Sequence, residues 1–224
     1  MAISDSLKAT KNRIAEACVA AGRAPDAVRL LVVSKTFPGA AVREAFAAGA
    51  RAFGENYVQE GLAKVEELAD LRSQLEWHLI GPLQSNKTRL VAEQFDWVHS
   101  VDRLKIAERL SEQRPPGLPP LNVCLQVNIS GEASKSGLLP AEVAPLARQV
   151  AALPRLKLRG LMAIPEPGPE ADEQHRAMAA LYASLLAEGL ALDTLSLGMS
   201  ADLEAAIAAG STMVRIGTAI FGAR

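Results

Sequence analysis

Val28-Arg-Leu-Leu-Val-Val-Ser-Lys-Thr-Phe-Pro38 combines a wholly apolar run with a lysine at its end. The run over residues 30–33 is typical of a strand that is buried on both faces of a parallel sheet. Lys35 follows Val33 by two residues, so alternation places both side chains on the same face. Two interpretations remain open. Either the lysine reaches water at the strand end, or burial leaves a neutral, nucleophilic amine that can form Schiff bases.

The rest of the chain repeats this unit of a short apolar run followed by a helical pattern. After an amphipathic helix over 4–22, the pattern predicts strands over 30–35, 51–54, 76–80, 97–101, 121–128, 156–163, 194–198 and 212–216. The intervening helices are expected over 39–49, 56–70, 84–94, 102–113, 140–152, 170–188 and 201–209. Repeated strand–helix units require a parallel sheet, and eight of them close most economically into a (β/α)8 barrel. An open, doubly wound sheet is the alternative. No break in composition divides residues 1–224, which predicts a single domain.

Composition excludes several classes of protein. The chain has 224 residues, 49% of them hydrophobic, and a net charge of −1, so it lacks the basic surplus expected for binding nucleic acid or an anionic membrane. Cys18 and Cys124 belong to no Cys/His cluster, which argues against a metal site or a disulfide framework. We therefore expect free thiols in a reducing compartment. The N-terminus has no signal-peptide pattern, so a cytoplasmic location is expected.

Polar side chains recur where the predicted strands end. The active sites of (β/α)8 barrels lie at the C-terminal ends of the strands. The residues found there are Lys35, Asn56, His78, His99, Asn128, Ser200 and Arg215. Their recurrence predicts a binding site at that end of the barrel.

The loops after strands seven and eight have the features of an anion site. Ser200 precedes the predicted helix 201–209, where it can act as the cap, and Gly217 allows close approach to the backbone before Thr218. These loops are the usual phosphate site of barrels, although a plain cap and a glycine turn are the simpler interpretation. A phosphate site that faces a strand-end lysine suits a cofactor with a phosphate at one end and an aldehyde at the other. Pyridoxal 5′-phosphate (PLP) has both groups.

The motifs resemble those of the YggS/PROSC family of pyridoxal phosphate homeostasis proteins. They include Val33-Ser-Lys-Thr36, Phe53-Gly-Glu-Asn-Tyr57, Trp77-His-Leu-Ile-Gly-Pro-Leu-Gln-Ser-Asn-Lys87, Gln126-Val-Asn-Ile129, Ser134-Lys-Ser-Gly137, Gly198-Met-Ser200 and Gly210-Ser-Thr-Met-Val-Arg-Ile-Gly-Thr-Ala-Ile-Phe-Gly222. The resemblance covers nearly the whole chain. It implies a single PLP-binding barrel of the alanine racemase type (PLP fold type III), with an extra N-terminal helix.

The resemblance also implies residue roles. Lys35 matches the lysine that forms the internal aldimine with PLP, and Arg215 matches the arginine beside the pyridine nitrogen. An arginine there keeps the nitrogen unprotonated and weakens PLP as an electron sink, although Arg215 could instead pair with a carboxylate on the barrel rim. Ser200, Gly217 and Thr218 match the phosphate-binding positions of the family, helped by backbone N–H groups around Met199 and Ser200.

Further residues are assigned on weaker grounds. Asn56 and His78 are expected to line the mouth of the barrel, and Met162 and Met199 to pack on the cofactor ring. For Asn56 and His78, a structural hydrogen bond is the alternative. Lys135 either contacts the phosphate or is a solvated loop lysine. His99 is interpreted as a packed core residue and His175 as a surface residue without a role.

The predicted function is that of a holder of PLP. A PLP racemase needs a base on each face of the ring, and alanine racemases take the second from a tyrosine in a separate C-terminal domain. Here the tyrosines are Tyr57 and Tyr182, and neither is placed for that role. We expect no catalytic residues and no metal, but a monomer that regulates free PLP and contacts PLP-dependent apo-enzymes transiently. The alternatives are a PLP-dependent amino-acid racemase or lyase, and a barrel enzyme for another phosphorylated metabolite in which Lys35 is a simple cation.

Overall fold

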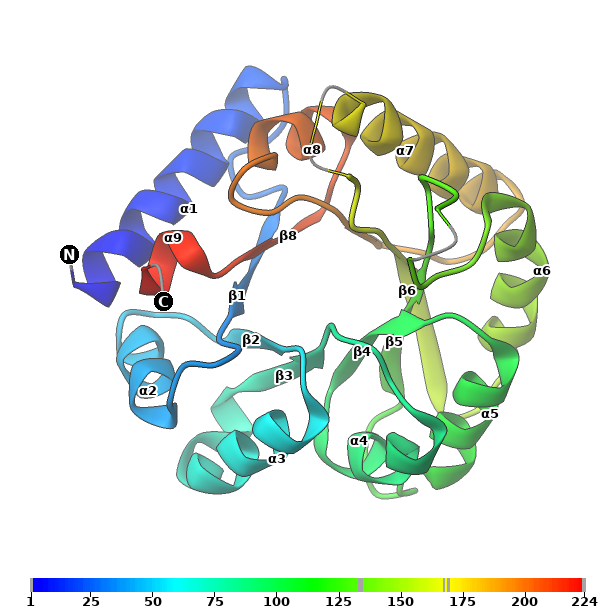
Figure 1. Cartoon of the computed structure of the whole chain (residues 1–224), viewed down its shortest axis with the longest axis horizontal. Helices are drawn as coiled ribbons and strands as arrows, with labels where there is room; N and C mark the ends of the chain where they lie inside the picture. Colours follow the sequence, from blue (N-terminus) through cyan, green and yellow to red (C-terminus); the bar gives the residue numbers. More distant parts are fainter. Residues whose placement is uncertain (1, 133–134, 167, 169, 223–224) are drawn as a thin grey trace.

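The computed structural model describes residues 2–132, 135–166, 168 and 170–222. Ser134 of the 134–137 motif lies outside these residues. Within them the strands pair in parallel and form a closed barrel in chain order, from β1 to β8 and back to β1 (Figure 1). The strands are β1 (Arg29–Val33), β2 (Ala52–Glu55), β3 (Glu76–Leu79), β4 (Trp97–Val101), β5 (Leu121–Gln126), β6 (Leu156–Met162), β7 (Thr194–Ser196) and β8 (Met213–Ile216). The prediction of a (β/α)8 barrel is confirmed.

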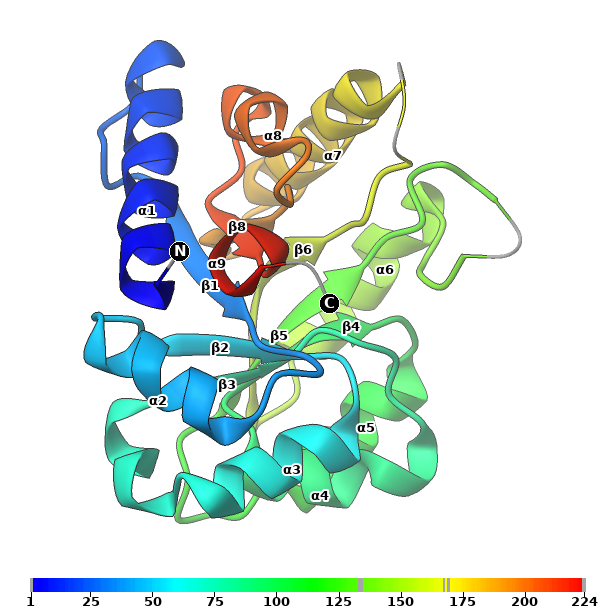
Figure 2. The same ribbon diagram turned by 60° about the vertical axis from the view of Figure 1, so that its left-hand side comes forward.

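Helices surround the barrel on its outside (Figure 1). They are α1 (Ile3–Ala20), α2 (Gly39–Ala47), α3 (Val58–Glu67), α4 (Thr88–Gln94), α5 (Leu104–Gln113), α6 (Pro140–Ala151), α7 (Ala171–Ala187), α8 (Leu203–Ala209) and α9 (Thr218–Phe221). The short 3-10 helices η1 (Ala69–Gln74) and η2 (Ser85–Lys87) follow α3 and precede α4. The extra helix α1 lies outside the ring beside α2, α8 and α9 (Figure 2).

Helix bounds differ from the predicted ones at both ends of the barrel. The predicted helix 56–70 divides into α3 and η1, and the predicted helix 84–94 divides into η2 and α4. Helix α8 begins at Leu203 rather than at residue 201, because residues 199–202 form a turn closed by the side chain of Asp202. The short helix α9 has no counterpart among the predicted elements.

Alternation along the strands separates two environments. Side chains that point outward, such as Val32, Phe53 and Leu195, belong to the large apolar core between the sheet and the helices. Inward-pointing side chains form two small apolar clusters, made of Leu31, Ala52 and Met213 on one side and Trp97, Cys124 and Met162 on the other. Other inward positions carry polar side chains that are buried, among them His78, His99, Ser196 and Arg215. The barrel interior therefore carries polar side chains below the site at the strand ends.

Both cysteines are buried free thiols, as predicted. Burial raises the pKa of the Cys124 thiol to about 12, which makes it unreactive. No helix in the described part of the chain is long and apolar enough to span a bilayer. The described residues also contain no group of three or more His, Cys, Asp or Glu side chains placed to hold a metal ion.

Candidate functional site

A cavity of about 870 Å³ opens at the C-terminal ends of the strands. Every residue predicted to bind the cofactor lines this cavity except His78: Lys35, Asn56, Met199, Ser200, Arg215, Gly217 and Thr218. Its volume is within the usual range for small-molecule sites. The topology therefore brings together residues that are far apart in the sequence.

Lys35 lies on a tight turn directly after β1. The N–H group of Phe37 donates to the carbonyl of Ser34 at 3.0 Å, which closes the turn. Thr36 has a φ of 66°, in the left-handed region that residues other than glycine rarely adopt. Its N–H group donates to the Glu60 carboxylate on α3, which holds the backbone in this conformation. The turn thereby fixes Lys35 at the wall of the cavity.

A buried ion cluster supports this turn from below. Lys64 on α3 is 4% exposed, and its Nζ donates to the Ser34 carbonyl at 2.7 Å, to Glu55 Oε1 at 2.8 Å and to Glu60 Oε1 at 2.9 Å. The Ser34 hydroxyl donates to Glu55 Oε1 at 2.5 Å. Burial raises the pKa of Glu55, although Lys64 and Ser34 act in the opposite direction. Lys64 thus links the backbone next to Lys35 to two carboxylates.

Backbone N–H groups in the loops after β7 and β8, the latter strand being the neighbour of β1, lie where the anion site is predicted. The N–H groups of Ser200, Gly217 and Thr218 have no hydrogen-bond partner among the described residues. A Cβ atom on residue 217 would lie 2.8 Å from the carbonyl oxygen of Val33, so only glycine allows the ends of β8 and β1 to approach this closely. Free backbone N–H groups at the start of a helix or in a turn are typical anion ligands.

The cap of α8 is Asp202, and the predicted role of Ser200 as the cap was wrong. Asp202 Oδ1 accepts a hydrogen bond from the Met199 N–H group at 2.7 Å, so that N–H group is not free to bind an anion. The other carboxylate oxygen of Asp202 lies 2.9 Å from Nε2 of His175. Burial alone would raise the pKa of Asp202, but the contacts with His175 and Met199 outweigh burial and lower that pKa. Asp202 therefore fixes the loop that presents Ser200.

His175 is not on the surface, as the sequence pattern had suggested. It is fully buried under the same loop, with Nε2 facing Asp202. Helix α7 turns this side chain inward, and the pattern on which the prediction rested included only its charged neighbours Glu173 and Arg176.

Arg215 is buried in the floor of the cavity and does not pair with a carboxylate among the described residues. Its Nη1 donates to the Ser196 carbonyl and hydroxyl, each at 2.7 Å, and Nη2 donates to the Ala163 carbonyl at 2.9 Å. These bonds use three of the five N–H donors of a guanidinium, which leaves two for the cavity. Burial lowers the pKa of Arg215 to about 10, so the guanidinium remains protonated at neutral pH.

His78 does not line the mouth of the cavity, and the alternative of a structural hydrogen bond is the one that the structure shows. The ring is fully buried inside the barrel and contacts Glu76 and His99. It points inward, as alternation requires, but lies one layer too deep because β3 continues past it. Ile80, two residues later on the same face, lines the cavity instead. His99 is a buried, hydrogen-bonded interior residue, as predicted.

The two methionines differ. Met199 lies at the rim of the cavity and is partly exposed, whereas Met162 packs with Trp97 and Cys124 inside the barrel and does not line the cavity. The expectation that Met162 packs on the ring is therefore not met.

Lys135 lines the cavity from the loop after β5, where it pairs with Glu166 at 3.2 Å and Glu132 at 3.6 Å. Asn128 and Gln126, at the end of the same strand, also line the cavity. The sequence pattern places Asn128 at a strand end and Gln126 in the same motif, but it assigns neither a role. Their position directly at the C-terminal end of a strand was the signal that could have identified them.

Comparisons with known proteins agree on the family. Residues 6–224 match the family described as "Alanine racemase, N-terminal domain". The chain is 66% identical to a pyridoxal phosphate homeostasis protein of Pseudomonas aeruginosa over 99% of this chain and 96% of that one. It is 59% identical to the protein of that name in Escherichia coli, over 99% of this chain and 97% of that one.

Solved structures show the same barrel. PipY of Synechococcus elongatus with PLP bound is 42% identical and superposes with a TM-score of 0.81, covering 93% of this chain and 100% of PipY. Alanine racemase of Corynebacterium glutamicum, at 19% identity and a TM-score of 0.70, shares the fold over 98% of this chain and 61% of its own. This chain is therefore a member of the YggS/PROSC family of pyridoxal phosphate homeostasis proteins, built on the alanine racemase N-terminal barrel.

Proposed function

We propose that this protein binds PLP covalently through Lys35 and holds it without catalysing amino-acid chemistry, as part of the control of free PLP. One observation carries the proposal. An amine, a guanidinium with two free donors and a set of unpartnered backbone N–H groups all face one cavity. That set matches the aldehyde, the ring nitrogen and the phosphate of PLP. The PLP-bound relative of the same family supports it.

Each group of the cavity has a defined task in this proposal. Lys35 would hold the cofactor at its aldehyde, where the amine nitrogen would replace the carbonyl oxygen and that oxygen would leave as water. The N–H groups of Ser200, Gly217 and Thr218 bind the phosphate. When bound, PLP supplies an electron sink whose strength depends on the protonation of its ring nitrogen. Arg215 would hold the ring nitrogen with one of its remaining donors and, as a cation, would disfavour protonation of that nitrogen.

The lining of the cavity supports holding rather than catalysis. Among the described residues that form it there is no tyrosine, histidine, cysteine, aspartate or glutamate. The second amine, that of Lys135, is engaged by Glu166 and Glu132. A racemase would need a second base opposite Lys35, and Tyr57, the tyrosine nearest in sequence to a cavity residue, is 61% exposed and does not line the cavity.

Titration with PLP tests the binding site. The wild-type protein should develop the visible absorption band of a lysine imine, and Lys35→Ala should not. Lys8→Ala, which removes an exposed lysine of α1, is the matched control and should behave as wild type. An imine band that persists in Lys35→Ala would overturn the assignment of Lys35.

Incubation of the PLP-loaded protein with amino acids in D2O tests the absence of catalysis. We expect no exchange of the α-proton by NMR beyond the rate produced by free PLP. Exchange at rates on the order of 1 s⁻¹ or faster, typical of enzymes, would favour the alternative of a racemase or lyase.

We also propose that the protein acts as a monomer in the cytoplasm and passes PLP to apo-enzymes by transient contact. Two buried free thiols are compatible with a reducing compartment. Met199 and Ile164 line the cavity and are partly exposed at its rim, where a partner would approach. PLP transfer whose rate rises with the concentration of an apo-enzyme would support direct contact. A rate set only by release of PLP would contradict it.

A further inference from the structure

We infer that Glu76, His78, His99 and Ser196 form a single hydrogen-bond chain through the barrel interior, and that this chain positions Arg215 for the cavity. Its effect on a bound cofactor rests on the proposed function, whereas the chain itself belongs to the protein alone. None of these four residues lines the cavity. They are positioning residues that act through Arg215.

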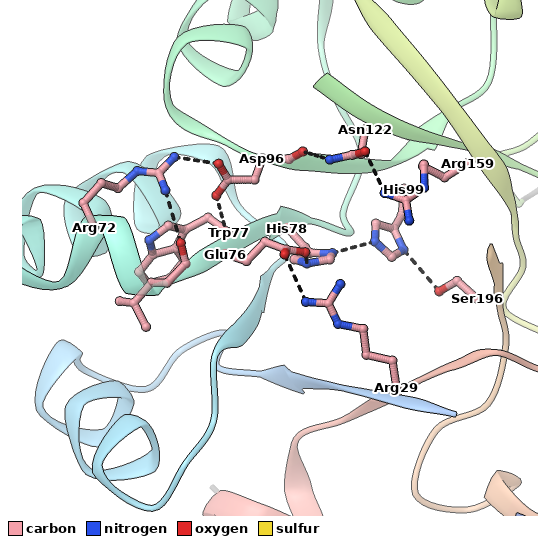
Figure 3. Close-up of polar contacts among 11 residues, drawn as sticks. Arg29, Arg72, Glu76, Trp77, His78, Asp96, His99, Asn122, Arg159 and Ser196 are labelled. Atoms are coloured by element: carbon pink, nitrogen blue, oxygen red, sulfur yellow. Dashed lines mark hydrogen bonds and ion pairs between the residues drawn. The ribbon is translucent and has the colours of Figure 1, made fainter. Parts of the chain in front are cut away.

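The chain is continuous from one end of the barrel to the floor of the cavity. Glu76 Oε1 lies 2.7 Å from His78 Nε2, and His78 Nδ1 lies 2.9 Å from His99 Nε2. His99 Nδ1 lies 3.1 Å from Ser196 Oγ, which in turn accepts a hydrogen bond from Arg215 at 2.7 Å. Figure 3 shows the two imidazoles between Glu76 and Ser196. Residues from β3, β4, β7 and β8 are thereby joined across the interior.

The chemistry of the two ends sets the direction of every bond. A guanidinium can only donate and an ionised carboxylate can only accept. Glu76 only accepts, so a neutral His78 and then a neutral His99 each keep Nδ1 as an acceptor, and the Ser196 hydroxyl, which accepts from Arg215, donates to His99 Nδ1. Nε2–H of His99 then donates to His78 Nδ1, and Nε2–H of His78 donates to Glu76. With both histidines neutral, this is the single arrangement that satisfies all four bonds.

The charges inside the barrel agree with this assignment. Burial lowers the pKa of both histidines, and for His99 the neighbouring His78 and Arg215 lower it further. Burial raises the pKa of Glu76, but contacts with His78 and Arg29 outweigh that effect and lower the pKa to about 2. Both imidazoles are therefore neutral at pH 7, and the carboxylate is ionised.

Packing holds the chain in place. Arg29 Nη2, at the start of β1, pairs with Glu76 Oε2 at 3.0 Å. The His78 ring stacks on Trp97 with a centroid distance of 5.0 Å and an interplanar angle of 10°. Rotation of His78 would break this stacking together with two hydrogen bonds. The Arg215 guanidinium is thus oriented by the carbonyls of Ser196 and Ala163 together with the Ser196 hydroxyl, whose chain of partners extends to the opposite end of the barrel.

Long-range ¹H–¹⁵N NMR of the PLP-free wild-type protein tests the chain without any variant. We expect His78 and His99 both to be neutral and protonated at Nε2 at pH 7.5. An Nδ1–H tautomer or an imidazolium at either residue would overturn the inferred chain, whether or not the protein binds PLP.

The Ser196→Ala variant tests the effect on the cavity. Removal of the hydroxyl takes one acceptor from Arg215 and the donor from His99, so PLP binding should weaken by about tenfold, the size expected for loss of about 1.4 kcal/mol. The ¹⁵N signal of the bound pyridine nitrogen should also shift. Ser196→Thr, which keeps the hydroxyl, should restore both values. Ser111→Ala, which removes a buried hydroxyl of α5 away from the chain, should match wild type.

The outcomes separate the two proposals. Unchanged affinity and an unchanged nitrogen signal in folded Ser196→Ala would overturn the positioning role while leaving PLP binding intact. Failure of the wild-type protein to bind PLP would overturn the proposed function, and the tautomers measured without PLP would still decide whether the chain exists.

Discussion

At the C-terminal end of the barrel, the Nζ of Lys35 and the N–H groups of Ser200 and Thr218 have no partner among the described residues. In the interior below them, the ring nitrogens of His78 and His99 are bonded to neighbouring side chains. Both regions carry polar groups and lie in the same barrel. In the interior the donors and acceptors bind one another, whereas at the C-terminal end several donors remain free among the described residues.

This difference shows what distinguishes the candidate site from a structural network. Buried polar groups are stable when they bind one another, and such groups have no capacity left for a ligand. Arg215 joins the two regions, because three of its donors bind the protein while two remain. The ion cluster around Lys64 has a related task, since it is internally paired and supports the turn that carries Lys35.

Lys64→Met should have the largest effect on stability. The substitution leaves Glu55 buried without its cation, and loss of one partner of a buried ion pair costs about 3–5 kcal/mol. Urea unfolding measures this loss. The turn at Ser34 should also loosen, so PLP binding should weaken in the fraction that remains folded.

The double variant Lys64→Met/Glu55→Leu is the control for this prediction. Replacing the whole ion pair by apolar side chains should recover most of the lost stability. A double variant as unstable as the single one would show that packing, rather than the unpaired carboxylate, dominates at this position.

Several features of the site could be predicted from the sequence because they depend on local pattern. The apolar run before Lys35 and the glycine before Thr218 mark strand ends, and the fold brings strand ends together. His78 was misplaced because alternation gives the face of a strand but not the depth within a barrel, which depends on where the strand ends. Lys64 has the sequence pattern of a solvated helix lysine, and only the contact with Glu55 shows that it is buried.

The pairings of the interior could not be predicted at all. Ser196 lies 97 residues from His99 in sequence, and Arg215 reaches Ser196 from the neighbouring strand. Asp202 was missed for a related reason, because its partners Met199 and His175 come together only once the loop and α7 are packed.

The histidines of the interior should make stability depend on pH. Burial lowers the pKa of His78 and His99, so the folded protein keeps both neutral while the unfolded chain takes up protons below about 6.5. The free energy of unfolding should therefore be constant above about pH 7. It should fall as the pH drops below 6.5, by up to about 1.4 kcal/mol per pH unit for each histidine.

Urea unfolding between pH 5 and pH 8 measures this dependence. In His99→Leu the free energy of unfolding should depend less steeply on pH below pH 6.5, by the amount that corresponds to about one proton. An unchanged slope in that variant would contradict a neutral, buried His99.

Lys135→Ala should have the smallest effect on stability. Its ion pairs with Glu132 and Glu166 lie at the surface, and such pairs contribute little. Thermal unfolding should give the same Tm as wild type. A clear drop in Tm would contradict this expectation and would show that the ion pairs of Lys135 stabilise the fold.

The most direct test of the central claim is to reduce the PLP-loaded protein with borohydride and map the modified lysine by mass spectrometry. The unpaired amine of the cavity, Lys35, should carry one PLP, while the buried and paired Lys64 should carry none. PLP on Lys64 or Lys135 in place of Lys35, or no adduct at all, would contradict the claim that the unpartnered groups at the C-terminal end of the barrel form the PLP site.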